Sequence, residues 1–374
     1  MVRLGIVGIG IIANDYIGLI AAGRVPHIQL TALCSRSQEK MDKVSSQYNL
    51  SVNTYLSYEQ MLLSGNIDAV LICTPHGQHP EMTRKALESG IHVLVEKPVG
   101  IYADTVEECV ELLKQKQDIV CGVMYNRRAS KAYGHIRKVV AAGEIGEIIR
   151  CTWLITNLYR TNAYYGTSQW RGSWATEGGG ILMTQASHQL DLMQWICGMP
   201  CEVLARCATV NRPIIVENEA ELFLSYPNGA RGHFIASAHE CPGTNLLEIC
   251  GTKGRISVRE DSIVEIIRLN QDEREFARNC PLPFAKAEGQ TETLVFDDSD
   301  NKLQQATTIE NFALAVLRKA QIQCSLEEGL GSLQIIHGAY VSWWSGTAVK
   351  LPVGEAQFRQ WMPTQPEIER QFIR

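Results

Sequence analysis

The chain has 374 residues, with 35 Lys or Arg against 40 Asp or Glu, so its formal net charge is −5. This length predicts two domains, and the mildly acidic balance without a basic run argues against a nucleic-acid surface. No apolar stretch approaches the length of a membrane span, and the first residues lack the order of a signal peptide, so we expect a cytoplasmic protein. The 12 cysteines include neither a Cys-x-x-Cys pair nor a zinc-like spacing, which favours reduced thiols and no metal site.

In roughly the first 120 residues, short apolar strands alternate with helical segments, a pattern typical of a doubly wound parallel sheet. We therefore expect an α/β fold whose residues 1–122 form an N-terminal Rossmann dinucleotide-binding domain. The expected strands cover residues 2–7, 28–34, 67–73, 92–96 and 119–124, and the expected helices lie at 14–23, 39–48, 58–63, 80–90 and 104–116.

A glycine motif, Gly8-Ile9-Gly10-Ile11-Ile12-Ala13, lies between the first strand and the first helix. Gly8 permits a tight turn, Gly10 lets a pyrophosphate approach the backbone, and Ala13 lets the helix pack close to the sheet. The N–H groups at the start of the helix then face the phosphates. This arrangement predicts dinucleotide binding, and the alternative is a plain glycine turn.

The second strand ends in Ser35-Arg36, where an NAD-preferring site usually carries an acidic residue for the ribose. Ser35 can hydrogen-bond a phosphate, and Arg36 can stack on adenine or pair with a 2′-phosphate. The sequence therefore favours NADP(H), with NAD(H) possible. Alternatively, Arg36 only caps a solvated loop.

A loop follows the strand that ends near Cys73 and contains Thr74, Pro75, His76 and His79. Backbone and imidazole donors at a strand end suit the ribose and diphosphate of a dinucleotide, so these four residues are cofactor candidates. Both histidines are equally well explained as ordinary loop and helix-capping residues.

The strand at 92–96 runs into Glu96-Lys97-Pro98, and proline ends it because it cannot donate to a ladder. Lys97 is thereby placed at the carboxyl end of a parallel strand, where open α/β sheets bind ligands. An ammonium group there can transfer a proton or stabilise an oxyanion. Without the other motifs, the simpler interpretation of Lys97 is a solvated side chain before a turn.

After residue 123 the chain becomes rich in strands that follow one another without helices between them. This order indicates an α+β domain at 123–374 with an open, mostly antiparallel sheet. A charged segment, residues 271–303, is expected to be a loop, and helices are expected at 307–320 and 325–344.

One helix, expected at 181–195, interrupts the strands directly after Gly178-Gly-Gly180. Thr184, His188 and Asp191 fall at i, i+4 and i+7, which places them on one helical face. A polar face behind a glycine run is a candidate site. The alternative is a buried histidine whose partner is Asp191.

Taken together, these motifs resemble those of the Gfo/Idh/MocA oxidoreductases, whose members include glucose–fructose oxidoreductase, inositol dehydrogenases and 1,5-anhydrofructose reductase. The resemblance covers nearly the whole chain. It rests on the glycine motif at 8–13, Glu96-Lys97-Pro98, Asn126-Arg127, Trp170-Arg171, and the glycine run with His188 and Asp191.

The resemblance implies an active site between the two domains, with Lys97 and His188 catalytic. It also implies that Asn126 contacts the cofactor and that Trp170 and Arg171 lie near its nicotinamide end. The cofactor-binding candidates are therefore Gly8, Gly10, Ile11, Ile12, Ser35, Arg36, Thr74, Pro75, His76, His79, Glu96, Lys97, Asn126, Trp170 and Arg171. The substrate candidates are Tyr164, Thr184, Gln185 and Asp191. Many family members carry an aspartate at the position of Thr184, and a threonine cannot tune an imidazole as a carboxylate does.

The predicted reaction is hydride transfer between NAD(P)(H) and a secondary alcohol or ketone of a sugar, cyclitol or glycoside. His188 would act as the base and Lys97 would stabilise the alkoxide. Two alternatives remain: a glycoside-processing enzyme with a tightly bound cofactor, and a cofactor-binding regulator without turnover. We expect a small-molecule partner and a homo-oligomer, dimer or tetramer.

Overall fold

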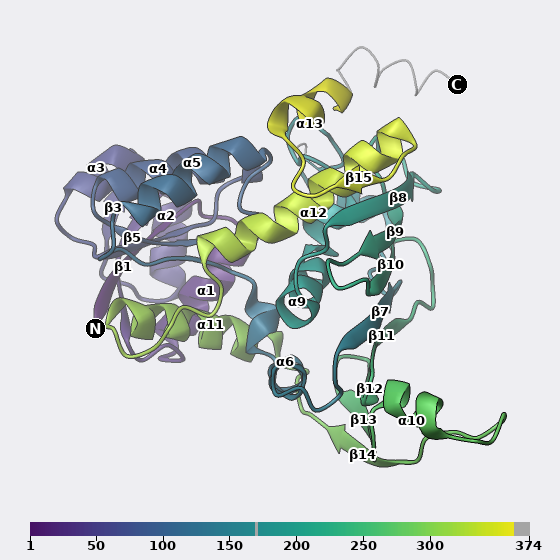
Figure 1. Ribbon diagram of the computed structural model, residues 1–374. Coiled ribbons are helices and arrows are strands. Elements are labelled where there is room, and N and C mark those ends of the chain that lie inside the picture. Colours follow the sequence, from purple (N-terminus) through teal and green to yellow (C-terminus); the bar gives the residue numbers. More distant parts are fainter. Residues whose placement is uncertain (169–170, 363–374) are drawn as a thin grey trace. The chain divides into compact units, whose positions relative to one another are not determined.

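The computed structural model describes residues 1–168 and 171–362. These residues form two compact units, which are described separately (Figure 1). The first unit contains residues 1–129 and 300–333, and the second begins at residue 130, continues to 299 and resumes at 334. The predicted boundary at residue 122 assigned residues 300–333 to the other domain.

The first unit is built on a six-stranded sheet in the order β3-β2-β1-β4-β5-β6, and every neighbouring pair is parallel. The α/β prediction is confirmed for this unit. Its strands are β1 (Val2–Val7), β2 (Ile28–Cys34), β3 (Asn53–Tyr55), β4 (Ala69–Ile72), β5 (His92–Val95) and β6 (Cys121–Val123). Its helices are α1 (Ile11–Ala21), α2 (Gln38–Gln47), α3 (Tyr58–Leu63), α4 (His79–Glu88), α5 (Ala103–Lys114) and α11 (Asn301–Val316), with 3-10 turns η1 (His76–Gln78) and η2 (Asn126–Ala129).

Helix α11 belongs to the first unit because its apolar face is part of that unit's core. Ile309 and Phe312 are fully buried in the cluster that also holds Leu4 and Ile17. The helix begins six residues earlier than the expected residue 307, since the side chain of Asp300 accepts a hydrogen bond from the backbone N–H of Leu303.

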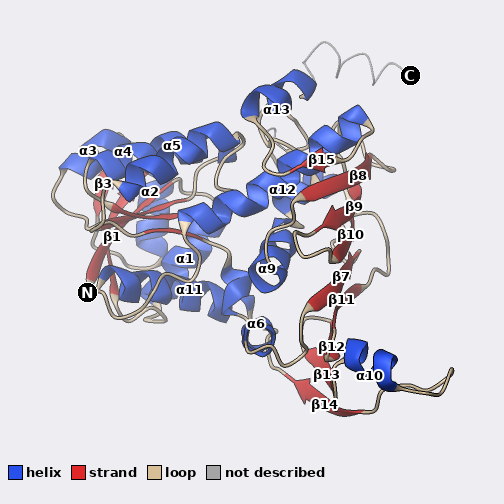
Figure 2. Cartoon of the chain, in the orientation of Figure 1, coloured by secondary structure: helices blue, strands red, loops and turns tan. Residues whose placement is uncertain are grey.

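The second unit is built on a nine-stranded sheet in the order β14-β13-β12-β11-β7-β10-β9-β8-β15 (Figure 2). Most neighbours are antiparallel, but β7 and β10 pair in parallel, so the sheet is mixed. Its strands are β7 (Ile148–Ile155), β8 (Glu202–Ala208), β9 (Glu219–Ser225), β10 (Arg231–Ser237), β11 (Asn245–Gly251), β12 (Gly254–Arg259), β13 (Ile263–Leu269), β14 (Gly289–Val295) and β15 (Val349–Lys350).

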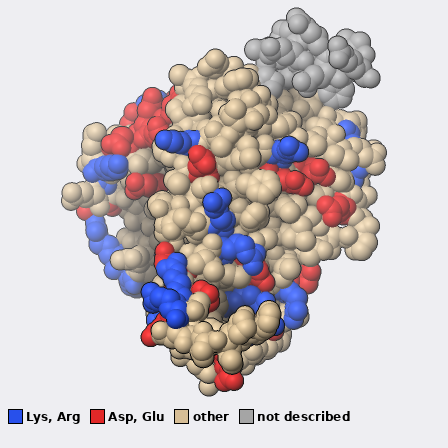
Figure 3. Space-filling model, turned by 45° about the vertical axis from the view of Figure 1, so that its right-hand side comes forward, with Lys and Arg blue, Asp and Glu red and all other residues tan. Residues whose placement is uncertain are grey.

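The second unit also contains helices. They are α6 (Lys131–Ala141), α7 (Asn162–Tyr165), α8 (Ile181–Thr184), α9 (Ser187–Cys197), α10 (Glu273–Asn279), α13 (Glu355–Trp361) and α12 (Leu326–Ser345), which contains the boundary between the units. In Figure 1, α10 lies on the other side of the strands from α6 and α9. Leu204 and Phe223 are 41% and 48% exposed. Figure 3 shows one face of the molecule, on which basic and acidic side chains are interspersed rather than gathered into one field of a single sign.

The expected loop at 271–303 is wrong, because this segment contains helix α10 and strand β14. β14 is the last strand at one edge of the sheet, and six of its seven residues are exposed. A strand without a buried face has no alternation of apolar and polar residues, so its sequence, Gly289-Gln-Thr-Glu-Thr-Leu-Val295, resembles a loop.

Candidate active site

A cavity of about 720 Å³ opens at the carboxyl ends of β1, β2 and β4 in the first unit. This edge of a doubly wound sheet is where dinucleotides bind. Six of the predicted cofactor residues line the cavity: Gly8, Gly10, Ser35, Arg36, Thr74 and Pro75.

The glycine motif has the geometry that a bound pyrophosphate requires. Gly8 has a φ of +90°, and a Cβ there would lie 2.8 Å from the carbonyl oxygen of Cys73. A Cβ on Gly10 would meet nothing within 4 Å, so the backbone is open on the side from which a ligand approaches. Gly10 is the N-cap of α1 and supplies no side-chain cap, which leaves the first N–H groups of this 11-residue helix available for phosphate oxygens. These residues fit a dinucleotide.

Two basic side chains lie beside the end of β2. Arg36 and Lys40 both line the cavity and are exposed, and neither forms an ion pair within the described chain. Lys40 was missed by the sequence analysis. Its signal was its place in the first turn of α2, whose N-cap Ser37 accepts a hydrogen bond from the Lys40 N–H. This turn directs a second cation to the same end of the cavity.

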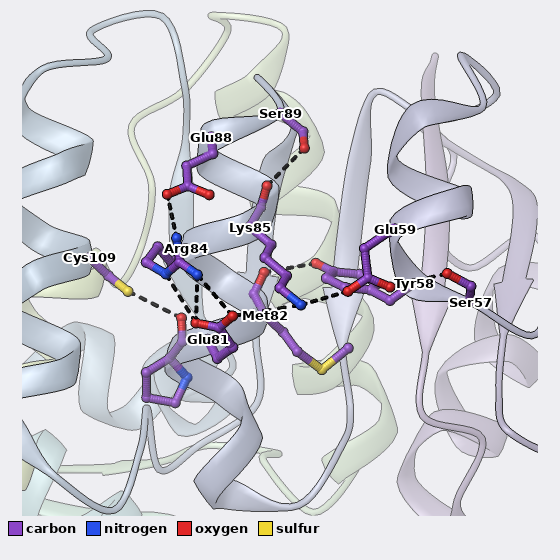
Figure 4. Close-up of polar contacts among 11 residues, drawn as sticks. Ser57, Tyr58, Glu59, Glu81, Met82, Arg84, Lys85, Glu88, Ser89 and Cys109 are labelled. Atoms are coloured by element: carbon purple, nitrogen blue, oxygen red, sulfur yellow. Dashed lines mark hydrogen bonds and ion pairs between the residues drawn. The ribbon is translucent and has the colours of Figure 1, made fainter.

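The opposite wall of the cavity comes from helices α3 and α4 (Figure 4). Tyr58 and Met82 line it, and the Tyr58 hydroxyl donates to the Met82 carbonyl oxygen over 2.9 Å. An ion pair of 2.6 Å between Lys85 and Glu59 joins the same two helices on the outside. Both contacts hold α3 against α4, so the wall is supported from two sides.

The loop after β4 is held by a buried histidine. His79 is 0% exposed, and its ring nitrogens lie 2.8 Å from the Pro98 carbonyl oxygen and 2.6 Å from the Thr74 carbonyl oxygen. Burial lowers the pKa of this imidazole, although both carbonyl contacts oppose the shift. His79 therefore positions the loops that follow β4 and β5. The cavity lining found in the described chain includes neither His79 nor the buried His76, and their contact with cofactor stays a prediction.

Glu96 and Lys97 follow β5 directly. The Tyr16 hydroxyl of α1 donates to the Glu96 carboxylate, and the Lys97 N–H donates to the same group over 3.2 Å. Burial raises the pKa of Glu96, and the Tyr16 hydrogen bond and the Lys97 charge oppose this. Glu96 thus ties the strand end to α1, while Lys97 is half-buried at the same edge of the sheet.

The remaining cofactor candidates lie in different surroundings. Asn126 is buried, and its side-chain amide donates to the Asn301 side chain over 2.8 Å. Ile11 is 86% exposed at the start of α1, and Ile12 is half-buried. Trp170 lies outside the described residues.

The glycine run of the second unit is organised by Glu217, which the sequence analysis missed. This fully buried carboxylate accepts hydrogen bonds from the Gly180 N–H (2.9 Å), the Leu182 N–H (3.0 Å) and the Tyr340 hydroxyl (2.7 Å). Burial raises the pKa of Glu217 to about 7 even though all three donors favour its charged form. No local motif marks this residue, because its partners come from distant segments.

Three of the four substrate candidates are in contact. The Tyr164 hydroxyl accepts hydrogen bonds from the Arg171 guanidinium and, over 2.9 Å, from the Gln185 amide. The Thr184 hydroxyl lies 2.5 Å from the Gln185 side-chain oxygen and 2.8 Å from the Gly180 carbonyl oxygen, either of which can accept its single proton. Arg171, expected near the nicotinamide, is therefore part of the Tyr164 environment.

The single helix expected at 181–195 is wrong. α8 ends at Thr184 and α9 begins at Ser187, and the Ala186 N–H reaches back to the Ile181 carbonyl oxygen, five residues earlier. Thr184 and His188 are consequently on different helices. His188 is half-buried in the first turn of α9, whereas Asp191 is 0% exposed and accepts from the Gln194 amide over 3.2 Å. Substrate contact by Asp191 stays a prediction.

The described residues contain no group of three or more His, Cys, Asp or Glu side chains placed to hold a metal ion. None of their helices has the length and apolar character needed to cross a membrane.

Comparison with known proteins assigns both units to one family. Residues 2–125 match the oxidoreductase family with an NAD-binding Rossmann fold, and residues 133–257 match the GFO/IDH/MocA C-terminal domain. Inositol 2-dehydrogenase of Rhizobium meliloti is 23% identical over 86% of this chain and 94% of that protein. Trans-1,2-dihydrobenzene-1,2-diol dehydrogenase of Mus musculus is 25% identical over 73% of this chain and 79% of that protein.

Solved structures share the fold. The WlbA dehydrogenase of Bordetella pertussis, solved in complex with NADH and UDP-GlcNAcA, has a TM-score of 0.76 and 24% identity, covering 94% of this chain and 99% of that chain. With both family domains matched in order along the sequence, the chain belongs to the GFO/IDH/MocA oxidoreductase family.

Proposed function

We propose that this enzyme transfers a hydride reversibly between a nicotinamide cofactor and a secondary alcohol or ketone of a sugar, cyclitol or glycoside. The observation that carries the proposal is the cavity at the strand ends, where Gly8 and Gly10 leave room for a pyrophosphate. The names of related dehydrogenases, among them inositol 2-dehydrogenase, support the substrate class. The bound cofactor would supply the hydride acceptor or donor.

In this proposal, Lys97 and His188 both act on the reacting oxygen of the substrate, in different roles. The Lys97 ammonium hydrogen-bonds the oxygen and stabilises the alkoxide, while the His188 imidazole takes up the hydroxyl proton. Imidazole is the side chain best suited to accept a proton near neutral pH. Thr184, in place of a carboxylate, supplies a hydroxyl that can orient Gln185.

The test is single-turnover spectroscopy of the reduced nicotinamide in Lys97→Ala and His188→Ala, using a panel of sugars and polyols. Each substitution should slow the hydride step by roughly a hundredfold or more, because general acid–base groups contribute about that much. Lys350→Ala and His233→Ala, both away from the site, are the matched controls. If the two active-site variants turn over like the unmodified enzyme, the assigned roles are wrong.

We further propose that NADP(H) is preferred over NAD(H). Arg36 and Lys40 lie together in the cavity beside Ser35, and no acidic residue follows β2 directly to hold the ribose 2′-hydroxyl. Two cations without an ion pair among the described residues suit a 2′-phosphate. The predicted homo-oligomer and cytoplasmic location stay predictions.

A further inference from the structure

Three arginines converge on two tyrosines in the second unit, and we call this group the arginine–tyrosine cluster: Arg160, Arg171, Arg212, Tyr159 and Tyr164. The Arg171 and Arg160 guanidinium carbons lie 4.4 and 5.1 Å from the centre of the Tyr164 ring. Arg212 lies 5.3 Å from the centre of the Tyr159 ring, and its Nε donates to the Arg160 carbonyl oxygen over 2.7 Å. Arg212 is therefore joined to the backbone of Arg160, although the two residues come from separate segments.

Positive charge in this cluster is not balanced by carboxylates. Only Arg171 pairs with one in the described chain, with Glu177 at 3.6 Å, and that carboxylate also accepts from the Gly172 N–H over 2.6 Å. Arg160 and Arg212 form no ion pair with any described residue, and their side-chain N–H groups reach only backbone carbonyl oxygens. Arg160 and Arg212 thus carry two positive charges that no carboxylate of the described residues pairs with.

Tyr165 lies close enough to Arg160 and Arg212 for both charges to act on its phenol. Burial and the adjacent Tyr164 raise the pKa of its phenol to about 12, and the charges of Arg212 and Arg160 oppose that rise. Arg160 and Arg212 are each half-buried as whole residues. Like charges held together at low exposure repel one another, so the arrangement is stabilised when an anion lies between them.

The cluster is contiguous with the substrate candidates. The guanidiniums of two of the arginines lie over the Tyr164 ring. The Tyr164 hydroxyl accepts a hydrogen bond from the side-chain amide of Gln185, the residue after Thr184. A ligand group held by Arg160 and Arg212 would therefore lie one hydrogen-bonded side chain away from the segment that leads into α9 and His188.

We propose that Arg160 and Arg212 bind an anionic group, a carboxylate or a phosphate, on the sugar or cyclitol that the enzyme oxidises or reduces. A guanidinium fork matches both groups because it donates two parallel N–H bonds to paired oxygens. This inference rests on the proposed function for the reaction, and it adds the substrate class: acidic or phosphorylated sugars over neutral ones.

The test compares matched sugars with wild-type enzyme and saturating cofactor. D-glucose is paired with D-glucuronate and D-glucose 6-phosphate, and D-galactose with D-galacturonate and D-galactose 6-phosphate. The anionic member of a set should have a kcat/KM at least about tenfold above its neutral counterpart, as expected for one charge-assisted contact. The uronates report a carboxylate specificity and the phosphates a phosphate specificity.

Arg160→Gln and Arg212→Gln should each lower kcat/KM for the anionic sugar about tenfold more than for its neutral counterpart. Arg160→Lys should retain part of the preference. Raising NaCl from about 0.05 M to about 0.5 M should lower kcat/KM for the anion and not for the neutral sugar. The control is Arg278→Gln, the same charge change on an exposed residue of α10.

Calorimetric titration of the enzyme with D-glucuronate or inorganic phosphate tests the anion site separately from the proposed hydride transfer. If no sugar is turned over but the anions bind in an Arg160- and Arg212-dependent manner, the anion site stands and the proposed reaction fails. Three results would each overturn the inference. The wild type could prefer the neutral sugars, the glutamine variants could lose equal kcat/KM for the anionic and the neutral sugar, or these variants could bind NADPH and NADH more weakly. The inference would also be overturned if the wild type neither turned over any of these sugars nor bound D-glucuronate or phosphate.

Discussion

We expect Ser35, Arg36 and Lys40, which lie beside the end of β2, to determine whether the enzyme prefers NADP(H) or NAD(H). Ser35→Asp should make NAD(H) the tighter ligand, because the new carboxylate accepts the ribose hydroxyl and repels a 2′-phosphate. Arg36→Ala should weaken NADP(H) by roughly ten- to a hundredfold, the size of one charge-assisted contact, and NAD(H) much less.

Fluorescence titrations of the wild type and both variants with NADPH and NADH measure these affinities. Lys43→Ala on the same helix, outside the cavity lining, is the control. Equal or tighter NADH binding by the wild type would show that Arg36 and Lys40 do not recognise a phosphate.

Glu217 gives the second unit a stability that depends on pH. Its pKa in the folded state is about 7 against an ordinary value of 4.5, because burial disfavours the charged form. The proton is therefore bound more tightly in the folded chain, so folding is favoured at low pH and loses stability as pH rises from about 4.5 through 7. At about 1.4 kcal/mol for each pKa unit, the loss approaches about 3 kcal/mol. Tyr340 and Cys207 lie beside it, and burial raises both of their pKa values.

Glu217→Gln should flatten this dependence. Between pH 5 and pH 8, the free energy of unfolding of the wild type should fall by up to about 3 kcal/mol relative to that of the variant. Urea unfolding at each pH measures this difference. The control for the loss of one acid is Glu221→Gln, at an exposed residue of β9, the strand that begins two residues after Glu217. Parallel pH profiles for wild type and Glu217→Gln would contradict the assignment.

At the scale of elements, the glycine run is what allows α8 to begin against Glu217. A Cβ at Gly180 would lie 1.8 Å from the Glu217 carbonyl oxygen, which accepts the Ile181 N–H over 2.9 Å. Gly180→Ala should therefore displace α8 and cost about 3 kcal/mol or more in unfolding free energy.

Replacing Gly134 by alanine should raise the free energy of unfolding instead of lowering it. Gly134 is inside α6, and a Cβ there meets nothing within 4 Å. Gly134→Ala should stabilise the protein by about 0.4–1 kcal/mol, because alanine restricts the unfolded chain. Chemical denaturation of both variants decides the matter, and a neutral Gly180→Ala would show that the backbone of α8 can shift without loss.

At the scale of the whole molecule, a helix nearly 300 residues downstream completes the cofactor-binding unit. Phe312 of α11 is 0% exposed in the core that contains Ile17 of α1. Phe312→Ala should destabilise this unit by about 3–5 kcal/mol, the cost of a buried phenyl cavity. Saturating cofactor, at a hundredfold over its Kd, should restore about 2.7 kcal/mol.

The matched control is Phe284→Ala, because Phe284 is 95% exposed in the second unit and its loss should change stability by less than about 0.5 kcal/mol. Thermal unfolding of both variants, with and without NADPH, separates the two outcomes. If Phe312→Ala is as stable as Phe284→Ala, α11 does not contribute to this core.

The sequence by itself determined the parallel sheet, the glycine motif and the position of Lys97, because each depends on residues adjacent in the chain. A buried strand followed by Gly8-Ile-Gly10, or by Glu96-Lys97-Pro98, constrains its own backbone and places a defined group at the strand end. Only the tertiary structure decided that α11 joins the first core, that Glu217 holds Gly180 from 37 residues away, and that Arg160 and Arg212 meet at Tyr159 and Tyr164. Contacts between distant segments leave no local periodicity, so burial and charge at these positions depend on the complete fold.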